Sequence, residues 1–99
     1  ILRIVAFADP ERLGNQQLAL VMLTVDPHRH NDVVEALTAL PQVSYVSTLL
    51  GRADIFAEVG SANNVELWGF LHTKVNTIEG VRSVETMAVL HVHKLRYGS

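Results

Sequence analysis

The sequence contains no cysteine, so a disulfide framework and thiolate chemistry are both excluded. Long hydrophobic runs are also missing, because no apolar stretch reaches the roughly 20 residues that a membrane-spanning helix needs. No charged segment followed by an apolar run resembles a secretory signal. A cytoplasmic protein without a membrane partner is therefore the default expectation.

Clusters of basic residues are absent as well. The eight Lys and Arg residues are scattered, the formal net charge is −2 and the isoelectric point is about 6.2. Phosphate backbones are bound by clustered positive charge, so this chain is not expected to contact nucleic acid by itself. What is abundant is apolar: 48% of the 99 residues are hydrophobic. This composition predicts one small globular domain that buries part of its apolar surface against a partner.

The segment from Gln17 to Asp26 is predicted to be a strand with two apolar faces. A strand with one solvated face alternates apolar and polar residues, and this one does not. We therefore expect helices on one face of its sheet and a second subunit on the other. The residues of the two faces are Leu18, Leu20 and Met22, and Ala19, Val21, Leu23 and Val25.

Two segments have helical periodicity. The first runs from Asn31 to Leu40, with Asn31 as its predicted N-cap and an apolar stripe at Val33, Ala36, Leu37 and Leu40. The second begins after Asn63, a predicted N-cap with Glu66 three residues later. Its predicted stripe is Val65, Trp68, Leu71, Val75 and Ile78, and Gly69 in its middle suggests close packing there.

The stretch from Val46 to Gly60 is predicted to be a β-hairpin. Strands at 43–50 and 53–59 flank a turn at Gly51, and the turn places Arg52 and Asp54 inside an otherwise apolar strip. A last strand is expected from Val81 to Leu95. An extra N-terminal strand is expected at 1–8, so residues 1–15 are interpreted as a linker strand and loop, and residues 16–99 as the domain.

The resulting order is that of an α+β, ferredoxin-like βαββαβ sandwich. An internal repeat supports it. Residues 40–49 and 78–87 share the pattern apolar-x-x-Val-x-x-Val-x-Thr-apolar at an offset of 38. Each copy leads from a helix end into a strand, as the pseudo-twofold symmetry of this fold requires.

With these motifs the chain resembles the effector-binding domain of the Lrp/AsnC family, the feast/famine transcription regulators. The resemblance extends from about Leu18 to Lys94. It is carried by the Leu-Pro-Gln-Val at 40–43, the Leu-Gly-Arg-Ala-Asp-Ile at 50–55 and the segment at 78–86. Residues 7–10 also resemble the strand that joins this domain to an N-terminal helix-turn-helix in the family. That DNA-binding domain is not part of the sequence, and the start at Ile1 without methionine suggests a fragment.

The resemblance implies a homodimer that stacks two sheets, further assembly of dimers to an octamer, and an amino acid or similar effector bound between dimers. It implies no cofactor and no enzymatic activity. Its effector-binding residues map onto the hairpin turn and the last strand of this sequence: Gly51, Arg52, Ala53, Asp54, Thr86, Met87 and Ala88. In this interpretation Asp54 accepts from the effector ammonium, while Arg52 pairs with its carboxylate or with Asp54.

Three other interpretations compete with an effector site. The histidine pairs at 28 and 30 and at 91 and 93 lack the third and fourth converging ligands that zinc prefers, so no metal site is expected. A small dimeric ferredoxin-like oxygenase or isomerase has the same size and topology, but it would keep its pocket inside one subunit. The third interpretation is an oligomerisation module without a ligand.

Overall fold

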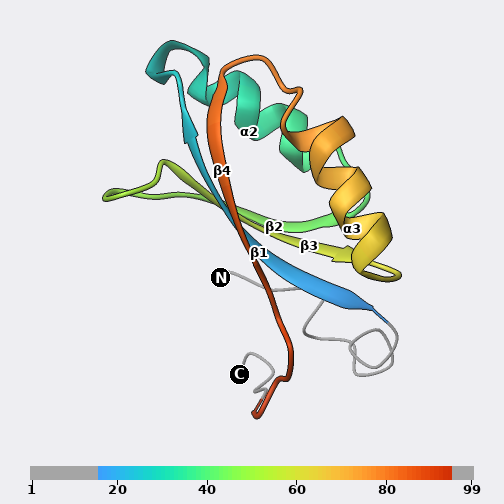
Figure 1. Ribbon diagram of the computed structural model, residues 1–99. Coiled ribbons are helices and arrows are strands. Elements are labelled where there is room, and N and C mark those ends of the chain that lie inside the picture. Colours follow the sequence, from blue (N-terminus) through green and yellow to red (C-terminus); the bar gives the residue numbers. More distant parts are fainter. Residues whose placement is uncertain (1–15, 95–99) are drawn as a thin grey trace.

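The computed structural model describes residues 16–94 (Figure 1). The N-terminal strand predicted at 1–8, like the rest of the 1–15 linker, lies outside the described residues. Within them the chain forms four strands and two main helical segments. In chain order these are β1 (Gln17–Val25), the 3-10 turn η2 (Pro27–Arg29), α2 (His30–Thr38), β2 (Val43–Thr48), β3 (Ile55–Ser61), α3 (Asn64–Phe70), the π-helical turn η3 (Leu71–Val75) and β4 (Val81–Ala88).

The strands form one antiparallel sheet in the order β2-β3-β1-β4. The two-faced strand β1 lies in the interior of the sheet, between β3 and β4. Figure 1 shows α2 and α3 together on one side of this sheet. The predicted ferredoxin-like sandwich is thereby confirmed, and the described residues leave the other face of the sheet without a helix.

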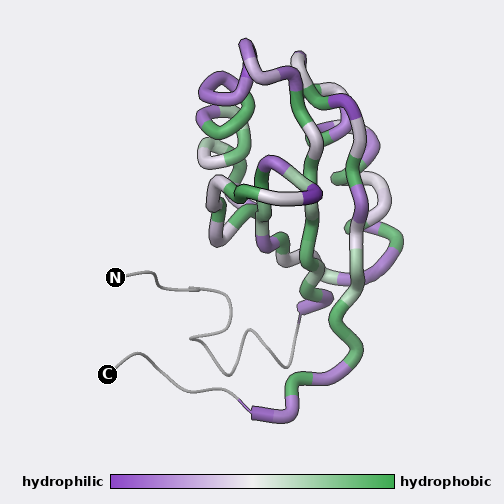
Figure 2. Tube along the Cα trace, turned by 90° about the vertical axis from the view of Figure 1, so that its left-hand side faces the viewer, coloured by the Kyte–Doolittle hydropathy of each residue, from purple (hydrophilic) through white to green (hydrophobic). Residues whose placement is uncertain are grey.

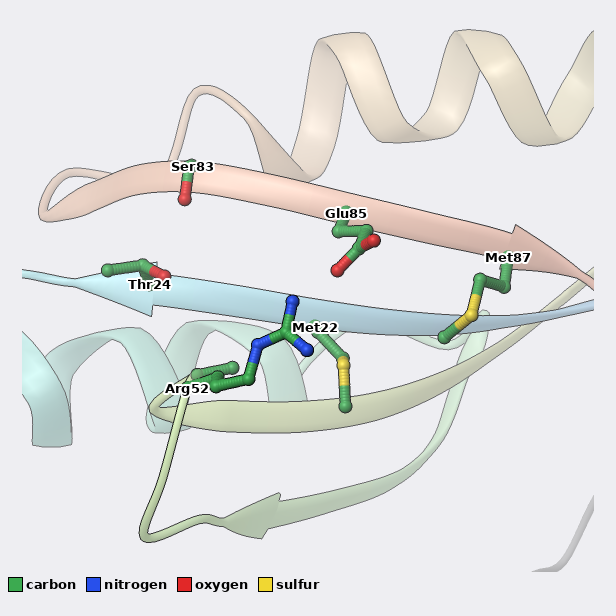
Figure 3. A pocket seen from close by; sticks show the side chains of 7 residues that line it. Met22, Thr24, Arg52, Ser83, Glu85 and Met87 are labelled. Atoms are coloured by element: carbon green, nitrogen blue, oxygen red, sulfur yellow. The ribbon is translucent and has the colours of Figure 1, made fainter.

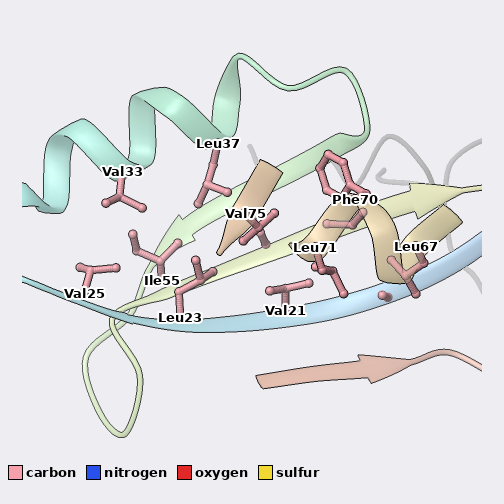
Figure 4. Close-up of a cluster of buried hydrophobic side chains, with 13 residues drawn as sticks. Val21, Leu23, Val25, Val33, Leu37, Ile55, Leu67, Phe70, Leu71 and Val75 are labelled. Atoms are coloured by element: carbon pink, nitrogen blue, oxygen red, sulfur yellow. The ribbon is translucent and has the colours of Figure 1, made fainter. Parts of the chain in front are cut away.

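The hydrophobic core lies between the helices and the sheet (Figure 4). From β1, Val21 and Leu23 point into it, and Val33 and Leu37 of α2 meet them from the other side. Figure 2 shows the same division along the trace, with hydrophobic segments in the strands and hydrophilic residues on outer helical turns. Burying one such side chain contributes about 1.5–3 kcal/mol, so this layer fixes the positions of the strands.

The internal repeat is visible in the sheet. β2 begins at Val43 and β4 begins at Val81, the two positions that the offset of 38 relates. Thr48 pairs with Ile55, and Thr86 pairs with Val21. Ile55 and Val21 are both core residues. Since directly paired residues share a face of the sheet, the two threonines of the repeat lie on the helix-covered side.

The predicted first helix has a different N-terminus from the one expected. Asp26, not Asn31, is the capping residue: its Oδ1 accepts the backbone N–H of His28 at 2.9 Å and starts the 3-10 turn η2. α2 then continues from His30 without a side-chain cap of its own. The prediction was wrong because helical backbone already begins at Pro27, four residues before Asn31. At the second helix the prediction is confirmed, since Asn63 Oδ1 accepts from Glu66 N at 2.9 Å.

The predicted stripe of the second helix was partly wrong. Val65 and Trp68 are 81% and 65% exposed, whereas Leu67 and Phe70 are buried. The cause is the π turn η3, closed by a hydrogen bond from Asn76 N to Leu71 O at 2.8 Å. A π turn advances less than 100° per residue and rotates the following side chains toward the Leu67 side. Close packing at Gly69 was also wrong, because no atom lies within 4 Å of the position its Cβ would take.

The last strand is shorter than predicted and ends at Ala88. Ala88 pairs with Ala19, and one further hydrogen bond joins Val89 N to Leu18 O at 2.8 Å. β1 begins at Gln17, so the chain beyond residue 89 has almost no strand left to pair with. Within the hairpin, β2 and β3 are separated by the loop 49–54.

Candidate functional site

The face of the sheet opposite the helices, here called the open face, is defined by the strand register. Leu20 of β1 pairs with Glu58 of β3 on one side and with Met87 of β4 on the other. Met22 pairs with Phe56 and Glu85 in the same way. These side chains therefore share one face. It is largely apolar, with two carboxylic acids set into it.

One end of the open face is hollowed into a pocket of about 320 Å³ (Figure 3). Its lining comes from three places: the second half of β1, strand β4 and the hairpin loop 49–54. The residues are Met22, Thr24, Arg52, Ala53, Ser83, Glu85 and Met87. The register brings the two strands' contributions together, since Thr24 pairs with Ser83 and Met22 pairs with Glu85.

The pocket carries one charge of each sign. Figure 3 shows the guanidinium of Arg52, which comes from the hairpin loop, on the side of the pocket facing the carboxylate of Glu85 on β4. Within residues 16–94, the ion pairs are Arg29 with Asp32, Arg29 with Glu79 and Arg82 with Asp26. Arg52 and Glu85 thus form no ion pair with a described residue.

The residues predicted for the effector site are divided by the structure. Arg52, Ala53 and Met87 line the pocket. Gly51 lies in the hairpin loop with a φ of 149°, a backbone conformation that side chains rarely adopt. Thr86 and Ala88 pair with Val21 and Ala19, so they lie on the opposite face of β4 and do not line the pocket.

Asp54 holds the hairpin loop to strand β1 through hydrogen bonds of its side chain and its backbone. Its Oδ2 accepts the backbone N–H of Val25 at 2.9 Å, next to a register shift in the pairing of β1 with β4. Its own N–H donates to Leu23 O at 2.9 Å, and its carbonyl accepts from Leu49 N at 2.9 Å. The carboxylate therefore extends the β1–β3 ladder where the loop leaves it. Arg52 and Asp54, whose pairing was one of the two alternatives for Arg52, form no ion pair.

Sequence reasoning missed Glu85, Ser83, Met22 and Thr24 as pocket residues. A signal for two of them was present. Side chains two apart in a strand share a face, so once Met87 is chosen, Glu85 and Ser83 follow from the period of two. The consecutive choice of residues 86–88 instead mixes both faces. Met22 and Thr24 of β1 could be predicted only from the pairing register between β1 and β4, which the sequence alone does not reveal.

The histidine pairs do not form part of this pocket. The rings of His91 and His93 contact each other edge to face, with centroids 4.6 Å apart. Among residues 16–94 no group of three or more His, Cys, Asp and Glu side chains is arranged to hold a metal ion. In that same range no helix is long and apolar enough to cross a membrane.

Fold and pocket together define a ferredoxin-like α+β sandwich with a small-molecule-sized site on its open face. Comparison with known families specifies it further, because the family described as the Lrp/AsnC ligand binding domain matches residues 18–98. The chain belongs to this family, whose ligand-binding domains are parts of transcriptional regulators.

Curated relatives agree with this assignment. The HTH-type transcriptional regulator FL11 of Pyrococcus furiosus is 34% identical over 94 residues, which cover 95% of this chain and 62% of that protein. FL11 of Pyrococcus horikoshii is 32% identical over 94 residues, again covering 95% of this chain and 62% of the relative. The chain thus spans about three fifths of the length of these relatives.

Solved structures show the same fold. AsnC of Escherichia coli superposes with a TM-score of 0.82 at 24% identity, covering 89% of this chain and 60% of that one. The transcriptional regulator NMB0573 of Neisseria meningitidis, solved as a complex with L-Met, gives a TM-score of 0.79 at 17% identity. That match covers 88% of this chain and 58% of the Neisseria chain.

Proposed function

We propose that this chain is the effector-sensing and oligomerisation domain of an Lrp/AsnC-type regulator, and that its pocket binds an amino acid. The observation that carries the proposal is the pair of opposite charges, Arg52 and Glu85, which face each other across the pocket without an ion pair to a described residue. An α-amino acid carries a carboxylate and an ammonium on adjacent atoms. It is therefore complementary to a pocket with one cation and one anion.

Each side of the pocket has a role in this proposal. The guanidinium of Arg52 pairs with the carboxylate in a two-pronged arrangement, and Glu85 accepts from the ammonium. The hydroxyls of Thr24 and Ser83 lie at one end of the pocket and supply further hydrogen bonds. Met22 and Met87 offer polarizable thioethers to the effector's side chain. A neighbouring regulator solved with L-Met supports an amino acid as the ligand class.

The same proposal includes assembly. The open face is apolar around Leu20, Met22 and Phe56, and a second copy stacked on it would form a homodimer. The pocket lies at the end of this face beside the hairpin loop, where a protomer of another dimer completes it. An effector that bridges dimers stabilises their association by mass action, which favours an octamer. DNA would be contacted through a helix-turn-helix outside this sequence.

The enzyme alternative is disfavoured by the position of the pocket. An oxygenase or isomerase of this fold would hold its site inside one subunit, whereas this pocket lies on the open face and includes the hairpin loop. The relatives that match the chain are named as transcriptional regulators. We therefore propose a domain that senses its ligand and does not transform it.

A thermal-shift screen with the twenty amino acids tests this function. At least one amino acid is expected to raise the melting temperature in a saturable way. The matching α-keto acid lacks the ammonium and the matching amine lacks the carboxylate, so both should lose most of the shift. If no amino acid changes the melting temperature while light scattering still shows an oligomer, the chain is an oligomerisation module without this ligand.

A further inference from the structure

The pocket on the open face has an ordered polarity along its two strands. Thr24 and Ser83, which pair directly, place two hydroxyl groups at one end (Figure 3). Glu85 follows two residues further along β4, and Met87 lies at the other end. Because residues two apart in a strand are separated by about 6.6–6.8 Å, the hydroxyls, the acid and the thioether follow one another over roughly 13 Å.

The end of the pocket at Met87 is apolar. Met87 pairs with Leu20 of β1, and the second thioether of the pocket, from Met22, lies on the same face beside Glu85. Met87 is 45% exposed, so a large part of its side chain can still be covered by a ligand. The described residues that line the pocket add no charge at this end, since Arg52 and Glu85 lie nearer its middle.

Of the two acids that the described strands place on the open face, Glu85 is the one at the pocket. Leu20 separates Glu58 from Met87, and Glu58 is 3% exposed and does not line the pocket. Burial raises the pKa of Glu58 from 4.5 to about 7, and the hydrogen bond from Ser44 lowers it only in part. Glu85 is exposed and lines the pocket, so it is the acid that an effector ammonium would meet.

The order of these groups sets the direction of a bound amino acid. In the proposed function its carboxylate and ammonium lie between Arg52 and Glu85. Either charged group gains hydrogen bonds beside the hydroxyls of Thr24 and Ser83, whereas a thioether is only a weak acceptor. The side chain of the amino acid therefore extends the other way, toward Met87.

We propose that the effector is an amino acid with an uncharged, apolar side chain, which extends from the paired Met22 and Glu85 toward Met87. The inference rests on the proposed function and specifies its ligand. Arg52 and Glu85 are both engaged by the α-carbon's own charges, so the described lining has no further charge to pair with a charged side chain. Placing such a charge against thioethers without a partner is unfavourable. An apolar side chain of four atoms spans about 5 Å and would cover Met87.

Isothermal titration calorimetry of the full chain with L-amino acids of increasing chain length tests the proposal. Alanine, α-aminobutyrate, norvaline and norleucine differ by one methylene each. Every methylene that reaches apolar surface should tighten binding by up to about fourfold. Lysine has the carbon chain of norleucine with a terminal ammonium, and it should bind at least about tenfold more weakly than norleucine.

Two variants separate the two ends of the pocket. Met87→Ala should leave the affinity for alanine nearly unchanged and remove the gain from the last methylenes. Ser83→Ala should weaken every member of the series by the same factor and leave the gain per methylene unchanged. Met87→Leu keeps an apolar side chain of similar volume and should restore the gain. Val65→Ala, which shortens an exposed apolar side chain on α3 outside the pocket, is the matched control.

Three results would overturn the proposal. Equal affinities across the series, or tighter binding of lysine or glutamate than of norleucine, would show that the side chain does not meet the apolar end. Loss of the methylene gain in Ser83→Ala, with the gain intact in Met87→Ala, would reverse the direction of the bound amino acid. Failure of the proposed function gives a different result, because no amino acid would then bind, and the inference falls with it. Circular dichroism of each variant ensures that only folded protein is compared.

Discussion

The carboxylate of Asp54 accepts the backbone N–H of Val25 at 2.9 Å, and this bond joins the end of the hairpin loop to strand β1. Val25 is buried, so removing the acceptor leaves an unsatisfied donor that costs about 1–3 kcal/mol. Asp54→Ala should therefore lower the free energy of unfolding by that amount in urea denaturation. Asp54→Asn keeps an oxygen acceptor and should lose less stability. Equal stability of Asp54→Ala and the wild-type chain would show that the bond from Val25 N–H to the Asp54 carboxylate does not stabilise the fold.

Replacing Gly80 and Gly69 with alanine should change the stability of the fold in opposite directions. At Gly80, φ is 101° and an added Cβ would come within 2.5 Å of Arg29 Cβ, so Gly80→Ala should cost roughly 1–3 kcal/mol or more. At Gly69 nothing lies within 4 Å, and a helix gains about 1 kcal/mol when alanine replaces glycine. Gly69→Ala should therefore raise the melting temperature. A stabilising Gly80→Ala would contradict the described turn before β4.

The stability of the chain should decrease as pH rises through neutrality. Glu58 has a higher pKa in the folded state than in the unfolded chain, so its contribution is complete below pH 4.5 and is lost as pH rises through about 7. The difference amounts to at most about 3 kcal/mol. About 2 kcal/mol of it is lost between pH 5.5 and pH 8.5, which urea denaturation of the wild-type chain should show, and Glu58→Gln should flatten this dependence. An unchanged slope in the variant would remove Glu58 as the cause.

A charge placed in the centre of the open face should prevent stacking. Leu20 lies between Glu58 and Met87, so Leu20→Asp would bury a further acid in the proposed dimer. Light scattering of the folded variant should give the monomer mass. Val65→Asp on the outer surface of α3, where the side chain is 81% exposed, should retain the wild-type mass. A dimeric Leu20→Asp would place the subunit interface elsewhere.

The sequence was most informative where periodicity and turn residues act locally. The apolar run from Gln17 to Asp26 predicted strand β1, and the repeat predicted the starts of β2 and β4 at Val43 and Val81. It was least informative where distant segments meet. The π turn at Leu71–Val75 changed the buried side of α3, and no local pattern predicts the bond from Val25 to Asp54.

The candidate site shows the same limit. Three of the predicted effector-binding residues, Arg52, Ala53 and Met87, line the pocket. They could be found because the hairpin loop and the last strand were correctly identified. Glu85 was not among the predicted effector-binding residues. Its place in the pocket depends on strand alternation and on the register of β4 with β1.

The central claim is that Glu85, opposite Arg52, holds the effector ammonium. Isothermal titration calorimetry with the amino acid that gives the largest thermal shift, on the wild-type chain, Glu85→Gln and Asp54→Asn, tests it most directly. A charge-assisted hydrogen bond is worth about 1.5–3 kcal/mol, so Glu85→Gln should weaken binding roughly 10- to 150-fold, while Asp54→Asn should bind within a few-fold of the wild-type chain. Full affinity in Glu85→Gln together with lost binding in Asp54→Asn would contradict the account and return the site to Asp54.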